Sequence, residues 1–145
     1  MKSSFLSTAA LLLSLSKLTL SQRVMTVAYD EVYDNANMDL LTTACSDGSN
    51  GLVTKGFSVA GDLPIFPRVG AAFSVGGWNS PSCGKCYKLT FEETGVEIPV
   101  IAIDHAGSGF NLAKEAMDEL TGGRAAELGR VDMSVTEAAP GDCGM

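Results

Sequence analysis

The stretch NSPSCGKCYKLTF, residues 79–91, decides the fold because only two residues separate Cys83 from Cys86. This spacing fits a redox-active pair, half of a zinc site, or two cysteines that belong to different disulfides. A redox pair lies at the start of a helix, where the helix dipole lowers the pKa of the first thiol. The residues that follow here, YKLTF, instead alternate apolar and polar side chains. That alternation predicts a strand and disfavours the redox interpretation.

The first 21 residues have the composition of a secretory signal peptide. Lys2 precedes an apolar run, and the small residues Thr19 and Ser21 fit a cleavage site before Gln22. The run is too short and too interrupted for a membrane span, which needs about 20 apolar residues. We therefore predict a cleaved signal peptide at residues 1–21 and one extracellular domain at residues 22–145, in a compartment where disulfides form.

The four cysteines can be assigned once export is expected. A zinc site would need all four, and the second closely spaced pair that makes such a site specific is missing. An even number of cysteines in a secreted chain favours disulfides, with three possible pairings. We favour Cys45–Cys83 and Cys86–Cys143, because each bond then closes a long loop and contributes about 4 kcal/mol. Bonding Cys83 to Cys86 would constrain the middle of the chain poorly. We expect no metal and no cofactor.

Length and charge exclude several classes of function. Without the signal peptide 124 residues remain, which suits one domain, and eight Lys and Arg face 17 Asp and Glu for a net charge of −9. No basic cluster is present, so we expect no nucleic-acid partner, and the acidic surface disfavours an anionic membrane. No other segment is apolar enough to span a membrane.

The remaining chain alternates short strands with turns. Gly122 is expected to end a helix over residues 110–123 that Asn111 caps, and a shorter helix is expected within 37–46, capped by Asn35 or Asn37. Residues 59–72 carry Gly, Pro and Asp and predict turns. Strands are predicted at residues 24–33, 86–91, 96–104 and 128–136. This pattern predicts a compact β-barrel with helical additions.

Four blocks of sequence together resemble the cerato-platanins, small secreted proteins of filamentous fungi. The blocks are ACSDGSNGL, GWNSPSCGKCYKLTF, IAIDHAGSGFNLA and LGRVDMSVTE, and they fall in the family's order with all four cysteines in place. The resemblance covers essentially the whole mature chain. It implies a six-stranded double-psi β-barrel related to an expansin domain, the same disulfide pairing, and a location outside the cell and in the fungal cell wall.

The resemblance also implies a function. Family members bind chitin fragments, N-acetylglucosamine oligomers or related wall polysaccharides such as cellulose, without conventional hydrolase activity. Several loosen wall material, assemble at air–water interfaces, and act on plants as elicitors of defence or as virulence factors. We therefore expect a non-catalytic carbohydrate-binding protein with a possible plant receptor as partner, and not an enzyme.

Asp104 is the strongest candidate site residue. It ends the most apolar predicted strand, just before the Gly-rich loop HAGSGF, so its carboxylate is desolvated on one side and open on the other. A turn-capping role explains the same position equally well. In expansins and barrel glycosidases of this shape the matching Asp is the general acid or its remnant, and this resemblance favours function. By the same resemblance, Asn111 faces the groove.

Hydrolysis would need a second carboxylate about 5 to 9.5 Å away. Asp30, next to Tyr29, is the candidate, although an exposed Asp at a strand end is the simpler interpretation. The alternative function is thus a weak glycoside hydrolase with Asp104 as acid and Asp30 as base. A third is a surface-active, self-assembling structural protein.

Aromatic side chains are candidates because sugars present apolar C–H faces. The single Trp78 is either a stacking platform or a core residue, and the core is the commoner place for a lone Trp. His105 either makes binding depend on pH or is a solvated loop residue. The predicted carbohydrate-binding residues are Tyr29, Asp30, Trp78, Asp104 and Asn111.

Overall fold

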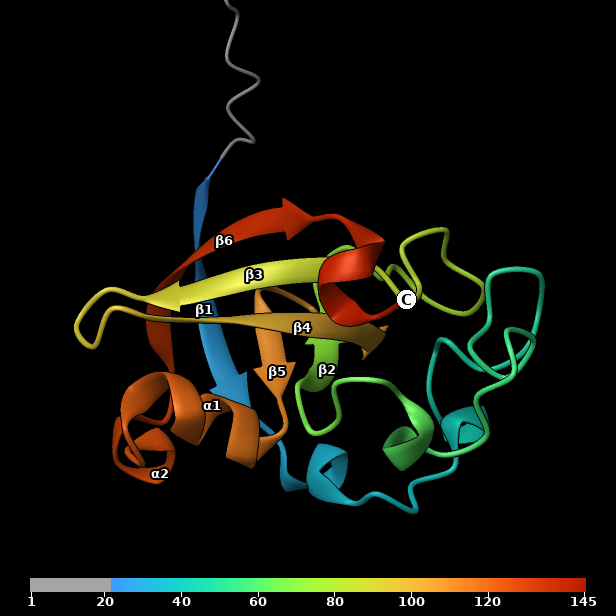
Figure 1. The fold of residues 1–145 in the computed structure, drawn as a ribbon, viewed down its shortest axis with the longest axis horizontal. Helices are drawn as coiled ribbons and strands as arrows, with labels where there is room; N and C mark the ends of the chain where they lie inside the picture. Colours follow the sequence, from blue (N-terminus) through green and yellow to red (C-terminus); the bar gives the residue numbers. More distant parts are fainter. Residues whose placement is uncertain (1–21) are drawn as a thin grey trace, which may run out of the picture.

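The computed structural model describes residues 22–145, which form a closed barrel of six strands (Figure 1). Around the barrel the order is β1, β5, β2, β4, β3, β6, with parallel pairing of β1 with β5 and of β2 with β4. The strands are β1 (Arg23–Tyr29), β2 (Val69–Ala72), β3 (Cys86–Phe91), β4 (Val96–His105), β5 (Phe110–Leu112) and β6 (Val131–Ala138). The predicted single-domain, mainly-β double-psi barrel with short helices is confirmed, whereas the predicted signal peptide lies outside the described residues.

Two short helices, α1 (Lys114–Thr121) and α2 (Ala125–Leu128), cover one end of the barrel, and long loops run along another side (Figure 1). These loops contain the 3-10 turns η1 (Glu31–Asp34), η2 (Leu40–Thr42) and η3 (Ala60–Asp62), and η4 (Pro140–Cys143) follows β6. Among residues 22–145 no helix is long and apolar enough to cross a membrane.

The barrel interior is filled by the apolar positions of the alternating strands. Phe110 is fully buried and packs edge-on against Tyr87 and Phe73, with ring centroids 5.3 and 5.8 Å apart. Edge-to-face aromatic contacts of this kind contribute beyond the burial of area. Strands whose side chains alternate inward and outward therefore give this small domain a continuous core.

The disulfides join Cys45 to Cys83 and Cys86 to Cys143, as predicted. Cys45 follows η2 in a loop, and Cys83 lies three residues before β3. Cys86 begins β3 and is bonded to the end of η4. No cysteine of the described chain is free. The redox and zinc interpretations of the Cys83–Cys86 spacing are therefore wrong.

The helix predicted for residues 110–123 begins later than its sequence pattern suggested. Residues 110–112 form β5, with Phe110 and Leu112 buried on one face, and α1 begins only at Lys114. Asn111 is thus a strand residue and does not cap the helix. The predicted end at Gly122 is confirmed, with a left-handed φ of 70°.

A residue far away in sequence caps α1 instead. The Asp34 carboxylate accepts from the backbone amides of Lys114 at 2.8 Å and Glu115 at 2.9 Å. These amides are two of the donors that a helix leaves unpaired at its start. Asp34 thereby fixes η1 to the helix.

Replacing Asp34 by Ala is expected to lower the free energy of unfolding by about 1 kcal/mol, because both amides lose their acceptor. Chemical denaturation followed by circular dichroism would measure the change. The matched control is Asp62→Ala, whose carboxylate also accepts from two backbone amides but only within its own turn. Equal effects of the two substitutions would contradict a special contribution of the long-range cap.

The strand β2 was not predicted. Its residues, Val-Gly-Ala-Ala, lack the large β-branched and aromatic side chains that mark strands. Close packing explains the small residues, since a Cβ at Gly70 would lie 2.4 Å from the Asn111 carbonyl oxygen on β5. The turn prediction for residues 59–72 is therefore wrong at its end.

Two further predictions were wrong in detail. The first strand ends at Tyr29 and continues into η1. The helix predicted within residues 37–46 is only the 3-10 turn η2, which Asp39 caps by accepting from Leu41 N at 2.9 Å. Neither Asn35 nor Asn37 is its cap.

Candidate functional site

The half-buried Asp104 joins three segments of the chain. Its Oδ2 accepts from the Tyr33 hydroxyl at 2.9 Å. Its Oδ1 accepts from the backbone amides of Ala44 and His105, each at 2.9 Å. The turn-capping interpretation therefore explains one of its bonds. The other two hold η1 and the segment after η2 against the end of β4.

Tyr33 is the partner that the sequence analysis missed. It is 7% exposed, and burial, followed by the charge and hydrogen bond of Asp104 and then the charge of Asp30, raises the pKa of its hydroxyl well above the usual range. The hydroxyl therefore stays protonated and keeps donating to Asp104. No local pattern could have indicated this contact, because 71 positions separate the two residues.

Asn111 lies in the same row of the barrel wall as Asp104. Both are Cα partners of Ala71, and Asn111 also pairs with Ala28, so Asp104, Ala71, Asn111 and Ala28 form a row across four strands. Cross-strand partners share a face of the sheet, which places the Asp104 and Asn111 side chains on either side of Ala71. We call these four residues the Ala71 row.

Arg130 orients the Asn111 side chain. Its Nη2 donates to Asn111 Oδ1 at 3.3 Å, and its Nη1 donates to Thr26 Oγ1 at 2.9 Å. Among the described residues, the amide nitrogen of Asn111 has no hydrogen-bond acceptor. Its two N–H groups therefore have no partner within residues 22–145, while Ala71, between Asn111 and Asp104, is itself buried.

The structure does not bring Tyr29 to this row. Tyr29 follows Ala28, so it points to the other face of β1, where the Lys114 Nζ lies 6.0 Å from its ring centroid. Asp30 is exposed and caps η1 by accepting from Val32 N at 3.0 Å. It is related to the site only through Tyr33, whose pKa its charge helps to raise.

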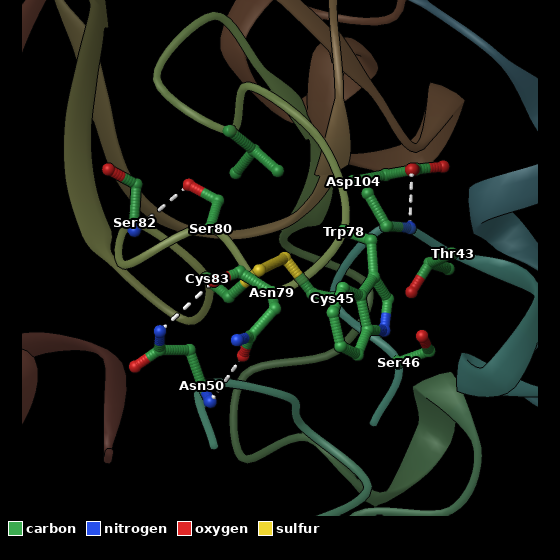
Figure 2. Close-up of a disulfide and its surroundings, with 12 residues drawn as sticks. Thr43, Cys45, Ser46, Asn50, Trp78, Asn79, Ser80, Ser82, Cys83 and Asp104 are labelled. Carbon is green, nitrogen blue, oxygen red and sulfur yellow. Dashed lines mark hydrogen bonds between the residues drawn. A yellow bond between two sulfur atoms is a disulfide. The ribbon is translucent and has the colours of Figure 1, made fainter. Parts of the chain in front are cut away.

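Trp78 is 63% exposed, so the interpretation that a lone Trp fills the core is wrong. Its indole Nε1 donates to Asp47 Oδ1 at 2.7 Å. Next to it, Asn50 donates its backbone amide to Asn79 Oδ1 at 2.9 Å and its side-chain amide to Asn79 O at 3.0 Å. The Cys45–Cys83 disulfide ties the same two segments together (Figure 2). We call residues 44–50 and 78–83, with these bonds, the Trp78 clamp.

The Trp78 clamp is continuous with Asp104. Ala44, at one end of residues 44–47, donates to Asp104, and Asp47, at the other end, accepts from Trp78. On the second loop, His105 Nδ1 lies 2.6 Å from the Val75 carbonyl oxygen, so its N–H holds the segment that leads to Trp78. His105 is exposed, as one of its two interpretations predicted, but it ends strand β4 and does not lie in the loop. The indole is therefore bonded to a segment that also bonds Asp104.

The groups of the site are suited to hydrogen bonding and stacking. Within residues 22–145, no cluster of three or more His, Cys, Asp or Glu could hold a metal ion. The site offers the Asp104 carboxylate as acceptor, the Asn111 amide as donor and the Trp78 ring as an aromatic face, and each is held by hydrogen bonds within the protein. Carbohydrate contact by the five predicted residues stays a prediction.

The Trp78–Asp47 bond is expected to depend on pH. The hydrogen bond from Trp78 holds the pKa of Asp47 below its usual value of 3.8. Because the folded-state pKa is lowered, this contribution to stability is present above pH 3.8 and is lost as the pH falls further. The fluorescence of the single tryptophan should therefore stay constant from neutral pH and change only below that value. In Asp47→Asn, which keeps an acceptor oxygen but does not titrate, the change should disappear; a persisting transition would contradict the assignment.

Comparison with known proteins agrees with this architecture. A family model described as cerato-platanin matches residues 25–145. An allergen Asp f 15 homolog from Arthroderma benhamiae is 47% identical over 144 residues, covering 99% of this chain and 70% of that protein. The crystal structure of cerato-platanin 2 from M. perniciosa is 46% identical with a TM-score of 0.81, covering 85% of this chain and 100% of that one. The solution structure of the fungal elicitor cerato-platanin is 34% identical with a TM-score of 0.73, covering 81% and 95%. The chain belongs to the cerato-platanin family.

Proposed function

We propose that the protein is a non-catalytic carbohydrate-binding protein that holds chitin oligomers, chains of N-acetylglucosamine, on the surface between Trp78 and the Ala71 row. The observation that carries the proposal is the exposed Trp78, whose indole is fixed to Asp47 on a segment that also binds Asp104. A rigid exposed aromatic ring loses little entropy when a ligand stacks on it. Because the Trp78 ring is exposed, it does not contribute to the packing of the core.

The chemistry of the surface matches N-acetylglucosamine. The indole face suits the apolar C–H face of a pyranose ring. The free N–H groups of Asn111, oriented by Arg130, suit the carbonyl oxygen of an acetamido group, and the Asp104 carboxylate suits hydroxyl donors. We propose that a chain of several sugar rings spans all three groups.

The same geometry favours binding over hydrolysis. A glycosidase needs one carboxyl group to donate a proton and another to act as nucleophile or base. Both oxygens of Asp104 accept hydrogen bonds from protein donors, and the Oδ1 of Asp30 accepts from Val32 N as a turn cap. Both oxygens of Asp104 are thus engaged within the protein, and Asp30 serves as a turn cap. Asp104 holds the wall of the site together.

The broader role follows from the family. Cerato-platanins are secreted fungal proteins, and the relatives compared above are named as an elicitor and as an allergen homolog. We propose that chitin binding underlies wall loosening by this protein, and that the exposed Trp78 surface is what a plant receptor recognises when the protein acts as an elicitor or virulence factor.

The test is a titration of the secreted, oxidised protein with N-acetylglucosamine oligomers, followed by NMR, with a reducing-sugar assay on the same sample. We expect shifts in the Trp78 indole and Asn111 side-chain signals and no released sugar. Cello-oligomers of equal length separate a preference for the acetamido group from general stacking. Released reducing ends that disappear in Asp104→Asn would overturn the proposal in favour of the hydrolase, and an absence of shifts would overturn carbohydrate binding itself.

A further inference from the structure

A hollow lies at one end of the barrel. Here β1 and β3 begin and β6 ends, and the hollow of about 260 Å³ is lined by Arg23, Met25, Phe73, Tyr87 and Val135 together with Ser74, Lys85 and Glu137. None of the five predicted carbohydrate residues lines it. We call it the barrel mouth.

The strand register shows that charged side chains point into the barrel mouth. Val27 is fully buried, and the alternation along β1 places Met25 and Arg23 on the same inner face. Arg23 of β1 pairs with the buried Val135 of β6, which confirms that Arg23 lies on the inner face. On the next inward position of β6, Glu137 pairs with the buried Tyr87 of β3.

The charges in the barrel mouth do not cancel. Lys85 Nζ lies 3.2 Å from Glu137 Oε1, so these two form an ion pair. Arg23 has no carboxylate partner among the described residues, and residues 1–21 contain no Asp or Glu that could supply one. A single uncompensated guanidinium therefore remains at the rim, in a protein whose overall charge is strongly negative.

Below the rim, the partly buried Phe73 and Met25 supply the apolar part of a lining that also carries polar groups. Phe73 and Tyr87 contact each other with ring centroids 6.0 Å apart, and Tyr87 and Val135, which also line the hollow, are buried. The hydroxyls of Ser74 and Tyr87 lie 2.5 Å apart and present a polar edge on one side. An occupant would thus meet the side chains of Phe73 and Met25 below and a cation with hydroxyls above.

We propose that the barrel mouth binds a small aromatic carboxylate. The acid group would accept from the Arg23 guanidinium, and the ring would pack on Phe73 and Met25. A volume of about 260 Å³ is below the range of about 300 to 1,000 Å³ typical of sites for drug-sized molecules, so the ligand has a single ring. Glu137 does not repel it, because Lys85 neutralises that carboxylate.

The test uses benzoate as the probe and the secreted protein as produced from its full chain. NMR titration is expected to shift the signals of Phe73, Ser74 and Tyr87 with a Kd of about 1 mM, as suits a ligand of so few atoms. Benzyl alcohol, which has the same ring without the charge, is expected to bind about tenfold more weakly. Absence of shifts at the barrel mouth would overturn the proposal.

Two variants separate a specific site from general charge attraction. Arg23→Gln removes the rim cation and should weaken benzoate binding about tenfold, with no effect on benzyl alcohol. Arg124→Gln changes the net charge equally but removes an arginine that is ion-paired with Glu93 and Glu127, and it should leave both affinities unchanged. Equal weakening by both variants would show that net charge alone attracts the anion and would overturn the site.

Discussion

Removing the Cys86–Cys143 disulfide by a double substitution to alanine is expected to lower the free energy of unfolding by about 4 kcal/mol. The bond links residues 57 positions apart, so its loss gives the unfolded chain a long unconstrained loop. It also releases η4 from the start of β3. Urea denaturation of the variant and the parent protein would measure the difference, since a domain of this size unfolds in one step.

The Cys45–Cys83 pair provides the matched comparison. Its loop of 38 residues predicts a similar loss of stability, about 4 kcal/mol. This disulfide, however, also belongs to the Trp78 clamp, whereas Cys86–Cys143 does not. At a temperature where both variants are folded, only the variant without Cys45–Cys83 should bind chitin oligomers more weakly. Equal affinities would show that the hydrogen bonds of the clamp hold Trp78 without the disulfide.

The sequence was most informative where a single face of a strand is buried. The predicted strands at 86–91, 96–104 and 128–136 correspond to β3, β4 and β6, although β6 begins only at Val131 and Leu128 belongs to α2. Their alternation reflects the inside and outside of the barrel, except at residues 100–103, which are all buried. Strand β2 escaped detection because close packing against β5 requires small residues there. Asn111 was placed on a helix because Leu112 continues the apolar spacing of α1. Leu112 is buried, however, as part of β5.

The candidate site was predictable only in part, for a different reason. Asp104 was recognisable by its position at the end of an apolar strand before a glycine-rich loop. The residues that hold the site together are distant in sequence from the residues they contact. Tyr33 lies 71 positions from Asp104, Asp47 lies 31 from Trp78, and Arg130 lies 19 from Asn111. Such pairs are created by barrel closure and leave no local pattern. The exposure of Trp78 was one of two interpretations, and frequency alone favoured the other, burial in the core.

Trp78→Ala is expected to weaken the binding of N-acetylglucosamine oligomers by about 2 kcal/mol, or about thirtyfold in Kd. The substitution removes the apolar area on which a sugar ring stacks. It leaves stability nearly unchanged, because the side chain is mostly exposed and is not part of the core. Calorimetric titration with the oligomers, together with thermal unfolding of each variant, would separate the two effects.

Three variants control this prediction. Trp78→Phe keeps an aromatic face and should bind with intermediate affinity. Val24→Ala truncates another exposed apolar side chain, on β1, and should bind like the parent protein. Asp47→Asn keeps an acceptor for the indole and should also retain affinity at neutral pH. If Trp78→Ala bound as tightly as the parent, the polar groups of the Ala71 row would have to provide the affinity alone, and Asp104 and Asn111 would then be the residues on which binding depends.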